Sequence, residues 1–395
     1  MTEPVGLMEP LLPQGNLGSL EDLAFELVAK ASGFTGKLNP VVRRSIGDLV
    51  RSMNCYYSNL IEGHNTHPRD IDRALSEDYS AEPEKRALQK EAVAHITVQK
   101  MIDSNEGPET YPINSEFGKW IHKELCERLP NELLCVENPD TGEKKKVLPG
   151  VYRDGEVRVG QHIPPLARNL DVFLKRFDEA YDPARLSKAH QIISVAASHH
   201  RYLRIHPFYD GNGRVVRLMS YSALLKLGIG NDVWSVARGL ARQKDKYKAL
   251  LEAADSDRHG DLDGRGTLSQ KELINFCEFF LRICIDQVEY MESLLDFSKL
   301  SERMRIYIEE EVAFKNLPKG SYPLLREALL IGEFERGRVE EITGLGNRTA
   351  RDVLSVLVKK GLLVSDTPRS AVRLGFPIDV IERWFPLLYP TTAKT

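Results

Sequence analysis

The residues whose types and spacing could do chemistry lie together in the segment HPFYDGNGRVVR, residues 206–217. Pro207 lacks an N–H group and disfavours helical geometry in the residue before it, so we expect a helix to end there. Gly211 and Gly213 accept positive φ angles, and nearby N–H groups could converge on an anion where a new helix begins. His206 has an ordinary pKa near neutrality, and we interpret it as a general base.

Two arginines follow this loop on one face of the expected helix. Arg214 and Arg217 are three residues apart, and arginine in a first helical turn opposes the helix dipole. A bound polyphosphate would offset that charge. Asp210 suits Mg²⁺, which prefers few carboxylates together with phosphate oxygens. For each residue taken alone, a glycine-rich connection with surface arginines is the structural alternative.

A second motif, SNLIEG at residues 58–63, ends the clearest helical pattern, which runs from about Pro40 to Glu62. A glutamate in the last turn faces the negative end of the helix dipole and is better placed with a cation opposite. A solvated surface side chain is the alternative interpretation of Glu62.

The segment 206–217 resembles the signature of the Fic (filamentation induced by cAMP) family, H-x-F-x-(D/E)-G-N-G-R-x-x-R, at every fixed position. Most members transfer AMP from ATP to a hydroxyl side chain of a target protein. The resemblance implies that His206 takes the proton of that hydroxyl, that Asp210 holds Mg²⁺ between the α- and β-phosphates, and that Phe208 is a core anchor. The nucleotide-binding residues it implies in this segment are Gly211, Asn212 and Gly213 as an anion hole, Arg214 at the β-phosphate and Arg217 at the γ-phosphate.

Residues 58–63 are similar to the inhibitory pattern of the family, which is Ser or Thr, three residues, Glu, then Gly or Asn. The resemblance implies that Glu62 pairs with Arg217 and denies it to the γ-phosphate of ATP, and that Ser58 braces the same helix. A bidentate carboxylate–guanidinium pair is strong enough to compete with a phosphate.

A hairpin pattern occupies residues 149–165, PGVYRDGEVRVGQHIPP, with Asp154-Gly155 as the expected turn and valines alternating with polar residues after it. Its later part, Val157 to Pro165, resembles the flap of the family, which clamps the target segment by strand addition beside the histidine. The flap residues assigned to the nucleotide site are Val157, Val159 and Gly160. A purely structural hairpin is the alternative.

Further along the chain, Gln243 and Tyr247 lie where relatives have residues that contact the base, although a tyrosine on an amphipathic helix is usually core. Residues 255–264 hint at a Ca²⁺ loop, but neither register supplies the terminal glutamate, and we interpret them as a polar loop closing the core. We interpret His199 and His200 as helix-packing residues.

The expected fold class is mainly α. We expect an N-terminal helical region with the inhibitory helix at 1–105, and a Fic-type helical bundle with a short β-hairpin flap at 106–298. A linker helix and a winged helix-turn-helix should fill 299–395, because helix, turn, helix and hairpin signals follow one another there. Arg348, Arg351, Lys359 and Lys360 lie on or near its candidate recognition helix, so DNA is a possible partner, and protein contact is the alternative.

The composition excludes several classes of protein. With 54 Lys+Arg against 57 Asp+Glu the formal charge is −3, which argues against a surface that binds polyanions everywhere. No apolar run approaches the ~18 residues of a membrane-spanning helix, and the acidic, proline-broken N-terminus predicts no secretory signal. The 5 cysteines form no C-x-x-C, which predicts free thiols and a cytoplasmic protein.

Together these patterns predict a self-inhibited protein adenylyltransferase that uses ATP and Mg²⁺. Its partner would be a target protein with a Ser, Thr or Tyr hydroxyl, or the chain itself, and a homo-oligomer stays open. Two alternatives remain: a reaction that removes AMP with the help of Glu62, and a DNA-binding regulator that uses the Fic core as a nucleotide sensor.

Overall fold

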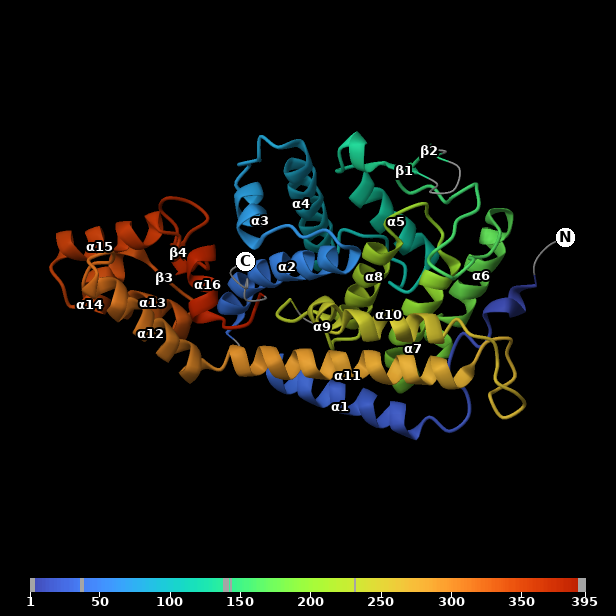
Figure 1. The fold of residues 1–395 in the computed structure, drawn as a ribbon. Coiled ribbons are helices and arrows are strands. Elements are labelled where there is room, and N and C mark those ends of the chain that lie inside the picture. Colours follow the sequence, from blue (N-terminus) through green and yellow to red (C-terminus); the bar gives the residue numbers. More distant parts are fainter. Residues whose placement is uncertain (1–3, 36–38, 138–141, 143, 231, 390–395) are drawn as a thin grey trace. The chain divides into compact units, whose positions relative to one another are not determined.

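A computed structural model describes residues 4–35, 39–137, 142, 144–230 and 232–389 (Figure 1). The fold is mainly α, as predicted, and divides into two compact units. Unit 1 comprises Met1–Ser32, Asn54–Asn231 and Ser235–Gln287, and unit 2 comprises Gly33–Met53, Asp232–Trp234 and Val288–Thr395. This division cuts within helices, and the domain boundaries expected from the sequence stay a prediction.

The helices of unit 1 are α1 (Gly18–Thr35), α3 (Pro68–Leu75), α4 (Pro83–Asp103), α5 (Ser115–Cys126), α6 (Leu170–Ala180), α7 (Lys188–Ile205), α8 (Asn212–Lys226), α9 (Val236–Arg242) and α10 (Lys244–Ala253). The last residues of α1 fall in unit 2. The division also falls inside α2 (Pro40–Glu62) and α11 (Gln270–Leu294).

Helices α7 and α8 form the centre of unit 1, and most of their residues are buried. The Ser187 side chain accepts a hydrogen bond from the N–H of His190 and begins α7. The helix ends at His206, which takes the left-handed conformation, φ 49°, because Pro207 cannot continue it. Helices α4 and α5 pack against α8, and α6 packs against α7.

An aromatic cluster fixes α6 on α7. The ring of Phe177 meets those of Tyr181 and Tyr202 edge-on, with centroids 4.7 and 5.6 Å apart. All three side chains are fully buried, and the Tyr181 hydroxyl donates to the Leu11 carbonyl at 2.5 Å. Burial of these rings stabilises the packing of the C-terminal half of α7, which carries Tyr202, against α6.

The short strands of unit 1 differ from the predicted hairpin. Strands β1 (Cys135–Glu137) and β2 (Lys144–Lys146) pair antiparallel, although their sequences show no strand-like alternation. In the expected flap, the turn at Asp154-Gly155 is wrong, because the one backbone bridge of this segment joins Val159 and His162. The turn lies at Gly160-Gln161, where Gly160 supplies the positive φ of 59°.

Unit 2 carries α12 (Phe297–Ala313), α13 (Ser321–Ile331), α14 (Val339–Thr343), α15 (Asn347–Lys359) and α16 (Ile378–Trp384). Its strands β3 (Glu333–Phe334), β4 (Leu363–Val364) and β5 (Val372–Leu374) form an antiparallel sheet in the order β3-β5-β4. The sequence predicted the two later strands and missed β3, which is 2 residues long. The assignment as a winged helix-turn-helix stays a prediction.

Within the described part of the chain, no helix has both the length and the apolar character of a membrane span.

The aromatic cluster gives a stability prediction. Replacing Phe177 by alanine should lower the free energy of unfolding by about 3–5 kcal/mol, because a large cavity opens under α7. Val172→Ala is the matched control, since Val172 lies on the same helix and is 48% exposed. Urea unfolding followed by circular dichroism measures both. Equal midpoints for the two variants would contradict the assignment of this cluster as the support of α7.

Candidate functional site

The segment 206–217 forms the loop 206–211 between α7 and α8 and the first residues of α8. Phe208 is fully buried, and its ring stacks on that of His122, with centroids 3.8 Å apart. The side-chain amide of Asn212 accepts from the N–H of Phe208 at 3.0 Å and donates to the carbonyl of the same residue at 2.8 Å. Gly211, with φ 82°, then starts α8. These contacts fix where the first N–H groups of α8 lie.

His206 sits at the junction with α7 and is neutral at physiological pH. Burial, aided by the positive charge of Arg153, lowers the pKa of His206 to about 4. A neutral imidazole can accept a proton from a substrate hydroxyl, which is the role of a general base.

Arg153, which the sequence analysis missed, ties the flap to this histidine. Its guanidinium donates to the carbonyls of His206 at 2.8 Å, Gly155 at 3.0 Å and Pro165 at 2.5 Å. Its backbone N–H donates to the carbonyl of Pro207 at 2.9 Å. Both ends of the flap are therefore held against the loop through one buried side chain. No local motif marks an arginine in this role.

The structure brings together the three residues expected to form the inhibitory contact. Arg217 donates to Glu62 Oε1 at 2.5 Å, to Ser58 Oγ at 2.9 Å and to the Ser58 carbonyl at 3.1 Å. Burial raises the pKa of Glu62, but the charge and hydrogen bond of Arg217 outweigh it, so the pKa is lowered. Glu62 is therefore an ionised carboxylate held on the arginine.

The Glu62 carboxylate also covers the first turn of α8. A Cβ atom placed on Gly213 would collide with Glu62 Oε1 and lie 3.0 Å from Arg217 Nη1. The absence of a side chain at Gly213 therefore gives the carboxylate its place at the positive end of the helix dipole.

A second acidic residue, Glu91 on α4, was not found from the sequence. It forms a buried ion pair with Nη1 of Arg214, whose Nη2 donates to Asp210 Oδ2 at 2.9 Å. The other oxygen of Glu91 lies 2.8 Å from Nδ1 of His64, whose pKa this bond raises. Burial lowers the pKa of Arg214, but Asp210 and Glu91 more than compensate and raise it. Both arginines of the motif are thus ion-paired to carboxylates.

Asp210 fits the predicted role of a magnesium ligand. Burial raises the pKa of Asp210, but the charge of Arg214 and the hydrogen bond from the N–H of Gly211 outweigh this effect. The pKa is therefore lowered, and the carboxylate is ionised. About half of the side chain is exposed beside the start of α8. Within the described ranges, no cluster of three or more His, Cys, Asp or Glu side chains could hold a metal alone. Mg²⁺ prefers few carboxylates together with phosphate oxygens, and Asp210 is a carboxylate that fits this preference.

The remaining predicted site residues lie in different environments. Val159 and Gly160 are exposed at the flap tip, Val157 is half-buried, and Gln243 is exposed between α9 and α10. Tyr247 is buried, and its hydroxyl lies 2.7 Å from Nε2 of His199. This burial favours the structural alternative for Tyr247. The other nitrogen of His199 lies 2.9 Å from Ser220 Oγ, as expected of a packing residue.

Comparison with known proteins identifies the motif-bearing segment. Residues 112–224 match the model of the Fic/DOC family. A protein adenylyltransferase Fic of Nematostella vectensis is 28% identical over 214 residues, which are 52% of this chain and 43% of that protein. The protein of the same name in Drosophila willistoni is 31% identical over 140 residues, which are 35% of this chain and 27% of that protein. The chain thus spans less than half the length of either curated relative.

A solved structure shows the same fold over most of the chain. A Fic family protein from Desulfovibrio desulfuricans G20 superposes with a TM-score of 0.53 at 18% identity and covers 93% of this chain and 98% of its own. At this identity the likeness speaks for the fold alone.

The neutral state of His206 predicts a pH dependence of stability. The pKa is about 4 when folded, against an ordinary value near 6.5, so the unfolded chain binds more protons between these pH values. The free energy of unfolding should therefore fall by roughly 1.4 kcal/mol per pH unit as the solution is acidified through this range.

Urea titrations at several pH values measure this slope in the wild type and in His206→Asn, which carries no titrating group. In the variant, the unfolding free energy should change less with pH, by roughly 1.4 kcal/mol per pH unit, which is the contribution of one proton. Identical slopes of unfolding free energy against pH in the two proteins would contradict a neutral His206 in the folded state. An NMR titration of the His206 ring protons measures its pKa independently.

Proposed function

Because residues 112–224 match the model of the Fic/DOC family, we propose that this chain transfers AMP from ATP to a Ser, Thr or Tyr hydroxyl of a target protein. The observation that carries the proposal is the complete motif, in which a neutral His206 and Asp210 lie on the loop that leads into the start of α8.

The phosphates of ATP would bind the N–H groups at the start of α8 together with Arg214 and Arg217. The target hydroxyl gives its proton to His206, and its oxygen attacks the α-phosphorus. The bond from this phosphorus to the bridging oxygen of the β-phosphate breaks, and pyrophosphate leaves. Mg²⁺ held by Asp210 would neutralise the phosphate charge. Positioning and charge stabilisation carry most of such a reaction.

We further propose that Glu62 restrains this activity. The carboxylate occupies Arg217 and the space above Gly213, and the resemblance assigns that arginine to the γ-phosphate. Nucleotide and glutamate would then exclude each other. Each ~1.4 kcal/mol by which the restrained state is favoured lowers the competent fraction about tenfold.

Removal of the carboxylate tests both proposals at once. After incubation with ATP and Mg²⁺, Glu62→Gly should gain the mass of AMP on itself or on a target in a cell extract, at least tenfold faster than the wild type. Glu84→Gly is the matched control, because Glu84 is an exposed residue of another helix in unit 1. Intact-protein mass spectrometry and α-labelled ATP report the product.

The double variant Glu62→Gly/His206→Ala should take up no label. Equal labelling with and without His206 would overturn the proposed reaction. Labelling of the wild type as fast as Glu62→Gly would overturn the restraint but leave the reaction standing.

The position of Glu62 supports a second candidate reaction, the hydrolytic removal of AMP. The carboxylate lies at the start of α8, where it could activate a water beside the bound AMP. Wild-type protein added to the AMP-modified product would then release AMP, and Glu62→Gly would not.

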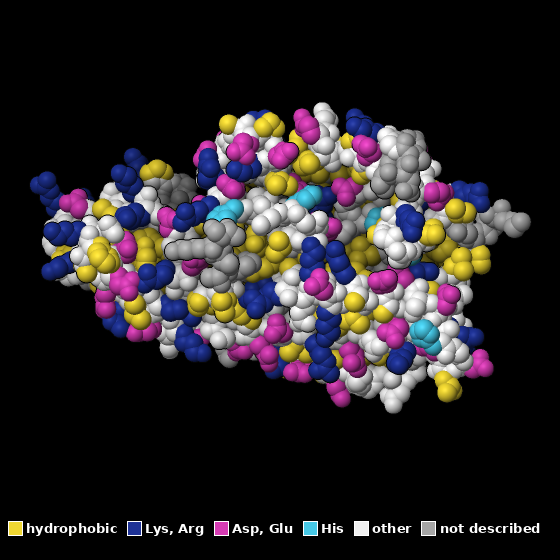
Figure 2. Space-filling view, viewed as in Figure 1, with side chains coloured by type: hydrophobic (Ala, Val, Ile, Leu, Met, Phe, Trp, Pro, Cys, Tyr) yellow, Lys and Arg dark blue, Asp and Glu magenta, His cyan; other side chains and the backbone are white. Residues whose placement is uncertain are grey.

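The basic face of α15 supports a separate DNA-binding proposal for unit 2. Arg348, Arg351, Lys359 and Lys360 are all exposed, and Lys and Arg side chains gather over this part of the chain in Figure 2. Duplex DNA would be held mainly through its phosphates.

A gel shift with genomic fragments tests this proposal. Arg348→Ala/Arg351→Ala should weaken binding. The slope of the logarithm of the binding constant against the logarithm of the salt concentration should also become shallower by roughly 1 to 2. The control Lys175→Ala/Lys188→Ala removes two exposed lysines of unit 1. An equal effect of both double variants would contradict a DNA site on α15, and binding unaffected by His206→Ala would favour the regulator alternative.

A further inference from the structure

The tip of the flap turns one side chain inward and leaves the others in solvent. Val159 and His162 exchange two backbone hydrogen bonds of 3.0 Å across the Gly160-Gln161 turn. Val159 and Ile163 are 41% and 76% exposed, whereas the side chain of His162 is 13% exposed. One backbone bridge with exposed neighbours cannot by itself hold a hairpin in place.

His162 binds the last turn of α7, just before the catalytic histidine. Its Nε2 lies 2.8 Å from the carbonyl oxygen of Arg204, two residues before His206. A carbonyl can only accept, so Nε2 carries the proton. This bond satisfies a carbonyl group of the last turn of α7, which has no partner within the helix. The hydrogen bond between His162 and the Arg204 carbonyl therefore fixes the position of the flap tip relative to His206.

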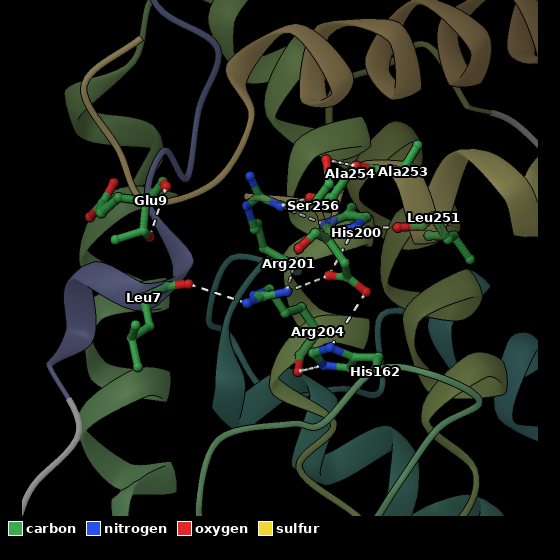
Figure 3. Close-up of polar contacts among 12 residues, drawn as sticks. Leu7, Glu9, His162, His200, Arg201, Arg204, Leu251, Ala253, Ala254 and Ser256 are labelled. Atoms are coloured by element: carbon green, nitrogen blue, oxygen red, sulfur yellow. Dashed lines mark hydrogen bonds and ion pairs between the residues drawn. The ribbon is translucent and has the colours of Figure 1, made fainter. Parts of the chain in front are cut away.

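Asp255 lies on the other side of the His162 ring, with Oδ2 3.5 Å from Nδ1. Its Oδ1 accepts from Arg204 Nη1 at 2.7 Å and lies 3.4 Å from His200 Nε2 (Figure 3). Burial raises the pKa of Asp255, but His200, His162 and Arg204 outweigh it and lower the pKa. The carboxylate is therefore a fixed negative charge facing the flap histidine.

The partners of Asp255 are themselves held in place. Arg201, fully buried, donates to the Pro10 carbonyl at 3.0 and 2.8 Å and to the Ala254 carbonyl at 3.0 Å. Arg204 donates to the Leu7 carbonyl at 3.3 Å (Figure 3). His200 lies 3.0 Å from the carbonyl of Leu251, which confirms that it is a packing residue. The end of α7 is thus bonded to residues 7–10 and 251–255.

We propose that His162 and Asp255 are positioning residues that hold the flap tip beside His206. Their role rests on the proposed function, in which the flap presents the target hydroxyl to that histidine. Among the described residues, the side chains of His162 and Asp255 bond to Arg204 and His200 and to each other, not to Asp210, Arg214 or Arg217. Residues 255–264, whose Ca²⁺ pattern failed in the sequence, would thereby acquire a part in target presentation.

Two substitutions of His162 separate positioning from folding, each placed in the Glu62→Gly background. His162→Gln keeps an N–H group that can reach the Arg204 carbonyl, and His162→Ala removes it. We expect amide hydrogen exchange of residues 151–165 to become five- to tenfold faster in His162→Ala and to return near the starting value in His162→Gln. AMP incorporation from ATP–Mg²⁺ should follow the same order, with a loss in His162→Ala and recovery in His162→Gln.

His259→Ala is the matched control, because His259 is an exposed histidine on the loop that follows Asp255. Thermal midpoints of all variants should agree within about 2 °C. Flap exchange that stays unchanged in His162→Ala, or rises equally in His162→Gln, would overturn the proposal. A loss of AMP incorporation in His162→Ala that His162→Gln does not restore would also overturn it, since the loss would then not follow the bond to the Arg204 carbonyl. If no variant incorporates AMP, the proposed reaction fails, and the exchange rates still decide the positioning role.

Discussion

The site depends on the burial of two arginines at the positive end of a helix. Arg214 and Arg217 project from the first turns of α8, are at most 8% exposed, and oppose the helix dipole. A buried cation without a partner is strongly destabilising, so the fold must supply anions around them. The anions are Glu91 from α4, Asp210 from the loop before α8 and Glu62 from α2. Ser58 adds a neutral hydroxyl that accepts a hydrogen bond from Arg217.

The carboxylates paired with Arg214 and Arg217 differ in how accessible they are to a competing anion. Glu91 is 2% exposed and lies on the inner side of Arg214, so an incoming anion would not reach it. The side chains of Glu62 and Asp210 are 35% and 48% exposed. A nucleotide with its metal could take over from these outer carboxylates while Glu91 still stabilises the buried charge. One ion pair would then maintain the fold, and the others would be exchangeable.

The sequence predicted the parts of the site that are contiguous. Residues 206–217 lie in one loop and one helical turn, so their spacing alone indicates their common direction, and the pattern around Glu62 is similarly local. Glu91 and Arg214 are 123 residues apart, and Arg153 and His206 are 53 apart, so no local spacing could reveal either contact. The flap turn was misplaced because Asp154-Gly155 has the composition of a tight turn. The carbonyl bonds of Arg153, rather than a strand ladder, hold that segment. Strand β3 has only 2 residues, too few to show the alternation of apolar and polar residues by which a strand is predicted.

The missing side chain at Gly213 has a kinetic consequence. Since the Glu62 carboxylate fills the space that a Cβ would need, its departure is a local event at the last turn of α2, and helix ends open far faster than whole domains rearrange. Nucleotide could then enter during brief openings without any separate signal. The apparent dissociation constant would be the intrinsic value divided by the open fraction, so the cellular ATP level would itself set how much of the protein is engaged.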